Sequence, residues 1–372
     1  MRNHWQNCIT HFDNDVTKFA TDYFSDQRRK CLLVAAAGFD PRSQTIAKLL
    51  SRTLSDRLSA LFIREERTNP DRDLVVRANE NEENLRGIVP ASKVISIDIF
   101  GDDGAAIAGA RIVAGLSENR IPADVTDVVL DLSALSIGIG FPAASLLLTE
   151  CESRTDLTFH IMIASNPELD DCIVGAPADR AIPVKGFSGS GSGYNEHEIA
   201  TIWVPQLAKG RTHALTEIGL SIGASYKVCP VVPFPARNPR RADDLLTEYQ
   251  NELVNEWEVD PRDIVYASER NPLDSYRTLS TLKERFDQTV DGIYEPNLVL
   301  SPMGSKVMAA GALMAAIEHN LKVQYVETEQ YLFDENSVAG AQEPDMIVHI
   351  LLSGPAYKNY GASKENENSD KG

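Results

Sequence analysis

The stretch CLLVAAAGFDPRS (31–43) decides the fold, because it joins a buried strand, a turn and the start of a helix. Its apolar run 31–37 has the length and composition of a strand that is covered on both faces. Gly38 marks the turn, and apolar residues at helical spacing predict a helix over 42–55. Strands that alternate with helices in this way indicate a parallel sheet.

The same alternation continues along the chain. In the first part the predicted strands are 31–37, 57–63, 93–100, 127–133 and 157–164, and the predicted helices are 42–55, 71–86, 103–119 and 140–152. In the second part the predicted strands are 228–234, 263–268, 297–301, 322–327 and 346–353, and the predicted helices are 240–257, 272–288 and 304–319. The predicted fold class is therefore α/β, with two Rossmann-like parallel-sheet units in tandem.

The remaining segments predict the domain boundaries. Residues 1–30 have apolar side chains at near-helical spacing and predict a helical lead-in. KGFSGSGSGYNEHE (185–198) predicts a linker, either a flexible surface loop or a lid over a ligand, and a helix is expected over about 199–219. The resulting division is a lead-in 1–30, a first unit 31–180, a linker with a helix 181–224, a second unit 225–355 and a disordered tail 356–372.

Three pairs of similar segments occur in the same order in both units and indicate a pseudo-repeat. GFDPRS (38–43) matches ARNPRR (236–241), ERTNP (66–70) matches ERNP (269–272), and DVVLDLSALSIG (127–138) aligns without gaps with NLVLSPMGSKVM (297–308). Each lies where a predicted strand ends and a helix follows. In open α/β sheets ligands bind at that end, where helix N-termini favour anions.

The net charge excludes some classes of partner. With 36 Lys and Arg against 54 Asp and Glu, the formal net charge is −18, which repels nucleic-acid backbones at long range. We expect no bulk nucleic-acid binding, although a local basic pocket can still hold a small anionic ligand. No apolar run reaches the roughly 18 residues of a membrane span, and the polar N-terminus does not resemble a signal peptide. We therefore expect a cytoplasmic protein with no membrane partner.

Cysteine and histidine spacing gives no sign of a disulfide framework or a metal site. The five cysteines are scattered and form no CxxC pair, so we expect reduced and mostly buried thiols. The seven histidines form no HExxH motif. We expect neither a metal nor a bound cofactor.

The segment Ser301-Pro302-Met303-Gly304-Ser305-Lys306 is the strongest candidate for a binding site. A strand ends at Ser301, Gly304 permits a tight turn, and a helix rich in Ala and Gly follows. Backbone N–H groups, the Ser305 hydroxyl and the Lys306 ammonium could hold an anion there. The Walker A pattern GxxxxGK[ST] is absent. The alternative is an ordinary strand–helix turn, with Ser305 as the N-cap and Lys306 in solvent.

The turn after the first strand is the second candidate. Gly38 allows close approach of a ligand to the backbone, and Asp40 could cap the helix that begins near Pro41. Capping does not explain Arg42, which could face the crevice. Because the GxGxxG fingerprint is absent, NAD binding of the usual kind at this strand is disfavoured.

Arg237, Arg240 and Arg241 form a basic group in an acidic protein. Two aspartates follow at once, so internal ion pairing is an alternative to ligand binding. If the crevices of the two units face each other, Arg42, Arg240 and Lys306 could share one anion site. That hypothesis fails if these side chains lie far apart.

Acidic and hydroxyl side chains follow other strands at the same edge. Asp131 and Ser133 lie at the end of the predicted strand 127–133 and Ser136 follows it, and Asp131 could bind a ribose hydroxyl or act as a base. Glu66 and Arg67, with Glu269 and Arg270, end the second strands, a place where an acid often contacts ribose. Turn formation and local ion pairing are the alternatives, and no catalytic residue is identified from the sequence.

LVLSPMGSKVMAAGALMAAIEH followed by KVQYVET resembles a segment of the CARF and SAVED domains. These Rossmann-like domains sense cyclic oligonucleotides in prokaryotic antiviral defence. Their strand ends in a Thr-Gly-Gly-Thr-Lys-type turn, and here Gly304, Ser305 and Lys306 match its last three positions whereas Pro302 and Met303 depart from it. SAVED proteins also carry two fused units. The resemblance implies a nucleotide sensor that works with a separate effector protein, as a homo- or hetero-oligomer.

Three functions are compatible with these observations. The first is a nucleotide-sensing component of a defence or signalling complex. The second is an enzyme that acts on a nucleotide or nucleoside, for example by glycosidic cleavage, with Asp131 or a glutamate as acid or base. The third is a protein-interaction scaffold of a defence complex. Nucleotide binding and turnover discriminate among them.

Overall fold

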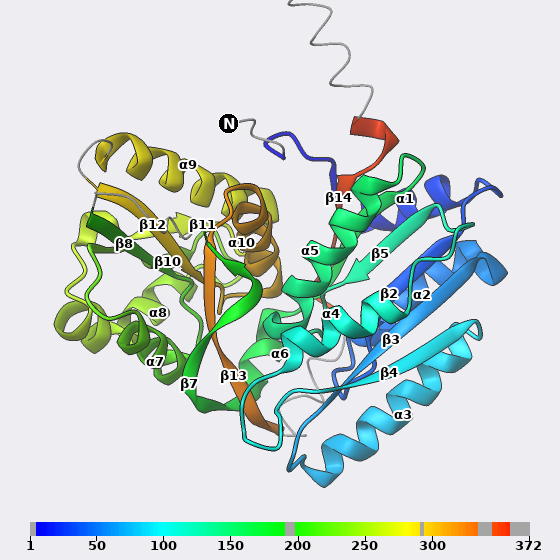
Figure 1. Ribbon diagram of the computed structural model, residues 1–372, viewed down its shortest axis with the longest axis horizontal. Helices are drawn as coiled ribbons and strands as arrows, with labels where there is room; N and C mark the ends of the chain where they lie inside the picture. Colours follow the sequence, from blue (N-terminus) through cyan, green and yellow to red (C-terminus); the bar gives the residue numbers. More distant parts are fainter. Residues whose placement is uncertain (1–4, 190–197, 291–293, 334–343, 358–372) are drawn as a thin grey trace, which may run out of the picture.

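The computed structural model describes residues 5–189, 198–290, 294–333 and 344–357 and contains two main β-sheets flanked by helices (Figure 1). The blue and cyan strands belong to the first sheet, and the long orange strand belongs to the second. Most neighbouring strands are parallel, so the predicted α/β class with Rossmann-like parallel strands is confirmed, whereas the predicted tandem repeat of two units is not.

The first sheet has seven strands in the order β1-β14-β6-β5-β2-β3-β4. Their bounds are β1 Thr10–Phe12, β2 Cys31–Ala36, β3 Leu58–Glu66, β4 Ser92–Asp98, β5 Asp127–Asp131, β6 Thr158–Ser165 and β14 Met346–Ser353. The five strands from β6 to β4 are parallel, whereas β14 and β1 add to the edge in antiparallel fashion. Every residue of β2, β5 and β6 is buried, because helices cover both faces of the sheet.

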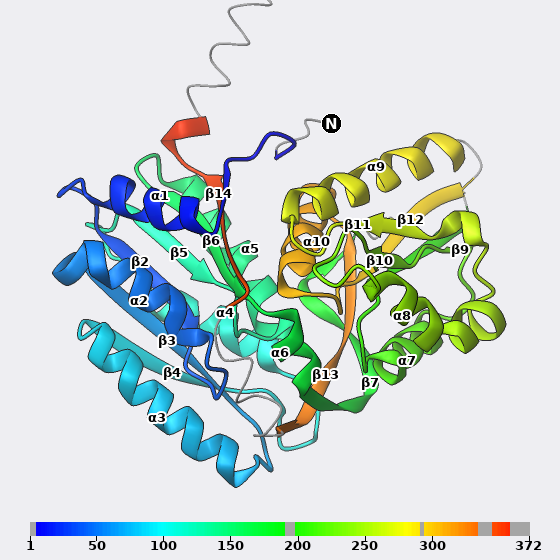
Figure 2. The ribbon, with the colours of Figure 1, turned by 180° about the vertical axis from the view of Figure 1, so that it is seen from behind.

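Five helices cover the first sheet. α1 (Asn14–Phe24), α2 (Ser43–Leu54) and α3 (Arg72–Ile88) contribute to the apolar core on one face, and α4 (Ala108–Glu118) and α5 (Ile137–Ser153) to the core on the other. A short helix, α6 (Pro167–Cys172), follows β6. Figure 2 shows α1, α2 and α3 side by side on their face of the sheet.

The second sheet has five strands in the order β7-β13-β12-β8-β9. Their bounds are β7 Ile173–Ser188, β8 Glu198–Pro205, β9 Lys227–Val228, β12 Tyr294–Ser301 and β13 Lys322–Phe333. A parallel pair, β10 (Val231–Pro233) and β11 (Val265–Ala267), continues from the end of β8 through a parallel bridge between Gln206 and Val231. The associated helices are α7 (Thr212–Ile222), α8 (Arg241–Glu248), α9 (Pro272–Val290) and α10 (Lys306–Glu318).

The two sheets exchange an edge strand. β7 follows β6 in the chain but pairs antiparallel with β13 of the second sheet. β14 follows β13 but pairs antiparallel with β6 of the first sheet. The sheets are therefore not built from two consecutive halves of the chain, and the chain crosses between them twice.

One apolar core runs from the first sheet to the second. It includes buried residues of α5, such as Phe141, together with buried residues of α10, such as Leu313, and of β8, such as Ile202. The small residues of α10 permit a close approach to α9, since a Cβ at Gly311 would lie 2.3 Å from the carbonyl oxygen of Pro272. The Ala/Gly-rich composition of α10 therefore reflects packing.

The predicted helix over 199–219 is wrong in its first part. Residues 198–205 form β8, which lies between β12 and β9, and the helix α7 begins only at Thr212. The run IATIWVP is apolar and rich in β-branched residues, which favours a strand. Within the predicted linker, residues 185–188 belong to β7, and 190–197 lie outside the described residues. Most of the predicted tail, 358–372, also lies outside them.

The strand order changes the pseudo-repeat. GFDPRS follows β2, which borders β5. Among the described strands, ARNPRR follows β10, which does not border β12, because β8 occupies that position and β10 is joined to the end of β8. This pair is therefore not topologically equivalent. DVVLDLSALSIG and NLVLSPMGSKVM do correspond, because β5 is the neighbour of β2 and β12 is the neighbour of β8. Within the described residues, none of the helices has both the length and the apolar character needed to cross a bilayer.

Candidate functional site

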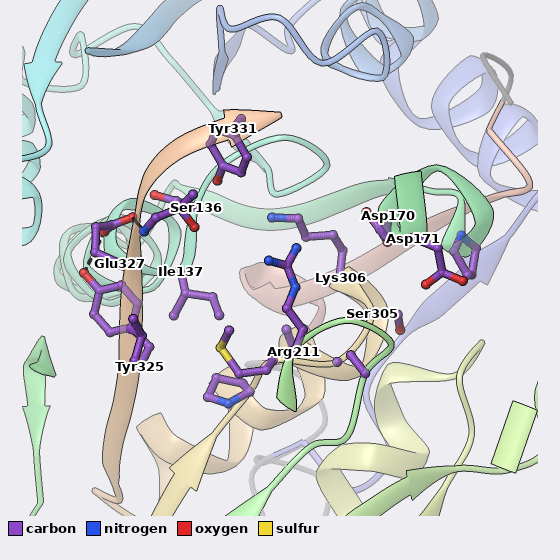
Figure 3. Close-up of a pocket in the computed structure, with 18 of the residues that line it drawn as sticks. Ser136, Ile137, Asp170, Asp171, Arg211, Ser305, Lys306, Tyr325, Glu327 and Tyr331 are labelled. Carbon is purple, nitrogen blue, oxygen red and sulfur yellow. Dashed lines mark hydrogen bonds between the residues drawn. The ribbon is translucent and has the colours of Figure 1, made fainter. Parts of the chain in front are cut away.

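Two adjoining cavities lie between the sheets, with volumes of about 130 and 120 Å³. They share Ser136, Asp170, Arg211, Lys306 and Tyr331 in their walls. Figure 3 shows Lys306 and Arg211 between Glu327 and Tyr331 of β13 on one side and Asp170 of α6 on the other. We call the two cavities together the crevice.

The carboxyl ends of strands from both sheets form the crevice. From the first sheet, Gly38 and Arg42 follow β2, and Ser136 follows β5. From the second sheet, Arg211 follows β8, and the turn 302–306 follows β12. This is the end of a parallel sheet at which α/β proteins bind ligands.

Lys306 lies where the two cavities meet. Ser305 caps α10, since its hydroxyl accepts a hydrogen bond from the Met308 N–H at 3.3 Å. The lysine does not extend into solvent, because its Nζ donates to the carbonyl oxygen of Leu135 in the first unit at 2.5 Å. Burial lowers the pKa of Lys306, and the Asp170 carboxylate acts in the opposite direction. Within the described residues, neither Lys306 nor Arg211 forms an ion pair with a carboxylate.

Arg42 is buried in the wall of the crevice, with 1% of its surface exposed. Its guanidinium donates to both carboxylate oxygens of Asp40, at 3.0 and 2.7 Å, and pairs with Asp170 Oδ1 at 2.8 Å. Asp40 therefore holds Arg42 and is not the cap of α2, whose N-cap position is Arg42 itself.

Two consecutive aspartates of α6 contact basic residues from both units. Asp170 pairs with Arg42 of the first unit, and Asp171 accepts from both terminal nitrogens of Arg241 at 2.6 and 2.9 Å. The helix begins at Asn166, whose side chain accepts from the N–H groups of residues 168 and 169. Both aspartates line the crevice.

Acidic and aromatic residues of β13 form the opposite wall. Glu327 accepts from the Tyr325 hydroxyl and from the Thr328 N–H, both at 3.0 Å. Burial and the neighbouring Glu65 raise the pKa of Glu327 to about 7, against the effect of Arg67. The Arg67 guanidinium pairs with Glu65 at 3.3 Å and lies 4.6 Å from the ring centre of Tyr331.

Asp131 and Ser133 lie behind the crevice. The Ser133 hydroxyl donates to Asp131 and accepts from the Ala164 N–H at 2.7 Å, which ties β5 to β6. Burial raises the pKa of Asp131 to about 7. Neither residue lines the two cavities, so their contacts are those of a strand connection.

Several other residues singled out in the sequence lie away from the crevice. Arg240 is exposed, and Arg237 pairs with Asp345 at 2.6 Å. Ser301 is buried and accepts from the Trp203 indole at 2.9 Å. Arg42 and Lys306 thus line one cavity, as hypothesised, whereas Arg241 lies at the crevice in place of Arg240.

The sequence reasoning singled out Arg67 but missed seven other charged or aromatic residues of the crevice: Glu65, Asp170, Asp171, Arg211, Tyr325, Glu327 and Tyr331. The predicted strand 322–327 was too short, because β13 continues to Phe333 and carries its later residues past the end of β12. Asp170 and Asp171 follow a strand end, a signal that could have been read. Arg211 could not be assigned to the crevice without the position of β8, because it follows that strand.

The charges in the crevice balance. The basic lining residues are Arg42, Arg67, Arg211, Arg241 and Lys306, and the acidic ones are Asp40, Glu65, Asp170, Asp171 and Glu327. The local composition differs from that of the whole chain, whose net charge is −18. Several buried polar atoms there have no hydrogen-bond partner in the described part of the chain, including Ser136 Oγ and one oxygen of Asp170, and such atoms often mark functional sites.

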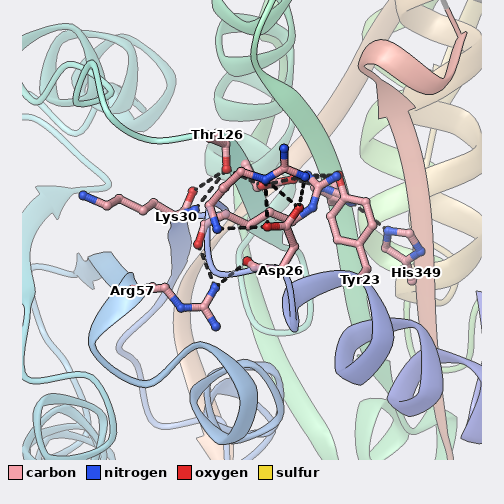
Figure 4. Close-up of polar contacts among 10 residues, drawn as sticks. Tyr23, Asp26, Lys30, Arg57, Thr126 and His349 are labelled. Carbon is pink, nitrogen blue, oxygen red and sulfur yellow. Dashed lines mark hydrogen bonds and ion pairs between the residues drawn. The ribbon is translucent and has the colours of Figure 1, made fainter.

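A second buried polar cluster lies at the amino end of β5. Asp127 accepts from Tyr23 at 2.8 Å and from Arg29 at 3.1 Å. Figure 4 shows the polar contacts of this region, with Tyr23, Thr126 and His349 labelled. His160 Nε2 lies 3.1 Å from Asp127, and His349 lies 2.9 Å from the other ring nitrogen of His160. The next ring along, His11, lies 2.9 Å from His349. These six residues form what we call the histidine chain.

Comparison with protein-family models and with curated proteins found no match to this sequence. In the parts of the chain that the structure describes, His, Cys, Asp and Glu side chains form no group that could hold a metal ion.

Proposed function

We propose that this protein binds a nucleotide in the crevice and acts as the sensor of a signalling or antiviral defence complex, together with a separate effector protein. The observation that carries the proposal is the position of Lys306, a cation without a carboxylate partner among the described residues, where two cavities meet. Such a cation is poised to bind an anion.

The surroundings of Lys306 support a phosphate-bearing ligand. The N-termini of α5 and α10 both open on the crevice, and helix N-termini favour anions. Tyr331 lines both cavities and supplies an aromatic ring beside the basic residues. The resemblance of the 301–306 turn to CARF and SAVED domains supports a nucleotide and an effector partner.

Nucleotide binding can be tested with Lys306→Met. Isothermal titration with a panel of mono-, di- and cyclic nucleotides should identify a ligand of the native protein, and the variant should bind it about tenfold or more weakly, since a charged hydrogen bond is lost. Arg240→Ala is the matched control, because it removes a basic residue at another strand–helix turn outside the crevice wall. Equal affinity of Lys306→Met and the native protein would refute the site.

A second candidate function is catalysis on the bound nucleotide. It rests on Glu327, whose carboxyl lines the crevice and has a pKa of about 7, in the range that suits a general acid or base. Chromatography of the nucleotide after incubation would detect turnover, which Glu327→Gln should abolish. Binding without turnover favours the sensor. A native protein that binds no nucleotide favours a protein-interaction scaffold.

A further inference from the structure

We propose that α6 is a built-in competitor of the ligand, whose carboxylates Asp170 and Asp171 occupy basic groups of the crevice until an anion displaces them. This inference rests on the proposed function, because it describes how binding at the same crevice is regulated. It gives α6 the role of the moving part of the sensor.

The first support is the pairing of the two aspartates. Asp170 contacts Arg42 and Asp171 contacts Arg241, so adjacent residues of one short helix bridge basic groups held by the two different sheets. The Asp171–Arg241 contact is bidentate, the geometry in which a guanidinium also binds phosphate. The carboxylates thus lie in the place that ligand oxygens would take.

The second support is electrostatic. The crevice has five basic and five acidic lining residues, and Asp170 and Asp171 are two of the acidic ones. An anion that entered with both in place would meet like charge at close range, which is strongly unfavourable. With α6 withdrawn, the wall would carry two more positive than negative side chains.

The third support is the weak anchoring of α6. Its apolar contacts belong to a small cluster with only Leu169 and Ile173 buried, separate from the large core. Among the described residues, one carboxylate oxygen of Asp170 is buried without a hydrogen-bond partner. An element with few buried apolar contacts and incompletely paired charges opens at low cost.

The position of α6 also provides an output. β7 begins at Ile173, directly after α6, and it is the strand that crosses to pair with β13. Arg211 Nη2 donates to the Ile173 carbonyl at 3.3 Å, so a basic residue of the crevice holds the junction of α6 and β7. Displacement of α6 would therefore be transmitted to the strand that links the two sheets.

The test compares Asp170→Asn/Asp171→Asn with Glu168→Gln. Glu168 is exposed on the same helix and forms no ion pair among the described residues, so Glu168→Gln removes one acidic charge and keeps the basic groups paired. Isothermal titration with inorganic pyrophosphate should give at least about tenfold tighter binding to the double variant than to the native protein. Glu168→Gln should bind like the native protein.

Hydrogen exchange of the native protein provides a second measurement that needs no variant. Adding saturating pyrophosphate should raise the exchange of residues 167–173 and lower that of the 302–308 turn. If the native protein binds pyrophosphate, the double variant binds no tighter and exchange in α6 is unchanged, the competitor role is refuted and the proposed function stands. If neither protein binds pyrophosphate or any nucleotide, the proposed function fails and the competitor role with it.

Discussion

Both ends of the first sheet bury charged side chains, but the two ends differ in how fully these side chains are paired. At the amino end, Asp127 is fully buried and has contacts to Tyr23, Arg29 and His160. At the carboxyl end, the crevice contains a lysine without a carboxylate partner and buried polar atoms without hydrogen bonds, among the described residues. A completed network serves the fold, whereas an incomplete one beside a cavity is suited to a ligand.

Aromatic packing makes the same distinction. Phe19 stacks on His349 with ring centres 4.2 Å apart and on His11 at 4.7 Å. Arg29 lies 3.6 Å from the ring centre of Tyr23. These rings close the histidine chain against α1, whereas Tyr331 stands in the wall of the crevice, where its ring adjoins open volume.

The largest effect on stability is expected for Asp127→Ala. It leaves the Arg29 guanidinium and His160 without their buried partner, and breaking such a pair costs about 3–5 kcal/mol. Urea unfolding at neutral pH should show a loss of that size in the free energy of unfolding. Nucleotide affinity of the folded fraction should be unchanged, because the crevice is at the other end of the sheet; a loss of affinity would mean that the two ends are coupled.

The pH dependence of stability is expected to report the buried histidines at the amino end of the sheet. Burial lowers the pKa of His349 well below its ordinary value, and it also lowers the pKa of His11. Below pH about 6.5 these histidines therefore bind protons in the unfolded chain that they do not bind in the folded protein, so their contribution to the free energy of unfolding should fall as the pH falls. Asp131 and Glu327, whose pKa values are raised to about 7, contribute in the opposite direction. The slope contributed by each histidine cannot exceed about 1.4 kcal/mol per pH unit.

Urea unfolding at pH 7, 6 and 5 measures this slope. His349→Phe keeps an aromatic ring against Phe19 and removes the titrating group, so the native protein should lose stability relative to the variant as the pH falls from 7 to 5. Parallel profiles of the native protein and His349→Phe would contradict the assignment of a neutral, buried His349.

Lys306→Met should have a small effect on stability, in contrast to Asp127→Ala. The variant loses the hydrogen bond to the Leu135 carbonyl, which costs about 1 kcal/mol, but it also removes a partly desolvated charge. Urea unfolding should place the net change within about 1 kcal/mol, in either direction. A loss of about 3 kcal/mol or more would identify Lys306 as a structural residue like Asp127.

The smallest effect is expected for Arg240→Ala. Arg240 is exposed, and its backbone N–H donates to the side chain of Asn238. The free energy of unfolding should change by no more than about 0.5 kcal/mol, and pyrophosphate affinity should match that of the native protein. A clear loss of affinity would extend the anion site beyond the crevice wall.

Much of the first sheet could be predicted from the sequence. Its parallel strands are apolar runs and its helices are amphipathic, so each element carries its own signal. The second sheet was harder to predict. The sequence predicts a helix where β8 lies, and β7 has a mixed sequence, IVGAPADRAIPVKGFS, with no clean alternation.

The candidate site could be predicted in part. Gly38, Arg42, Gly304, Ser305 and Lys306 follow strand ends in the sequence and line the crevice. The choice between Arg240 and Arg241 could not be made, because it depends on the orientation of the first turn of α8. Asp171, which selects Arg241, comes from a helix that was not predicted.

The sequence by itself determined the α/β class, the strand–turn–helix units and the strand ends at which charged residues gather, because these depend on local hydrophobic periodicity and turn chemistry. Only the tertiary structure decided which charges meet. Pairing of β7 with β13 and of β14 with β6 depends on contacts between residues far apart in the chain. That exchange places α6 between the sheets and sets its aspartates against basic residues of both, and no local pattern encodes this arrangement.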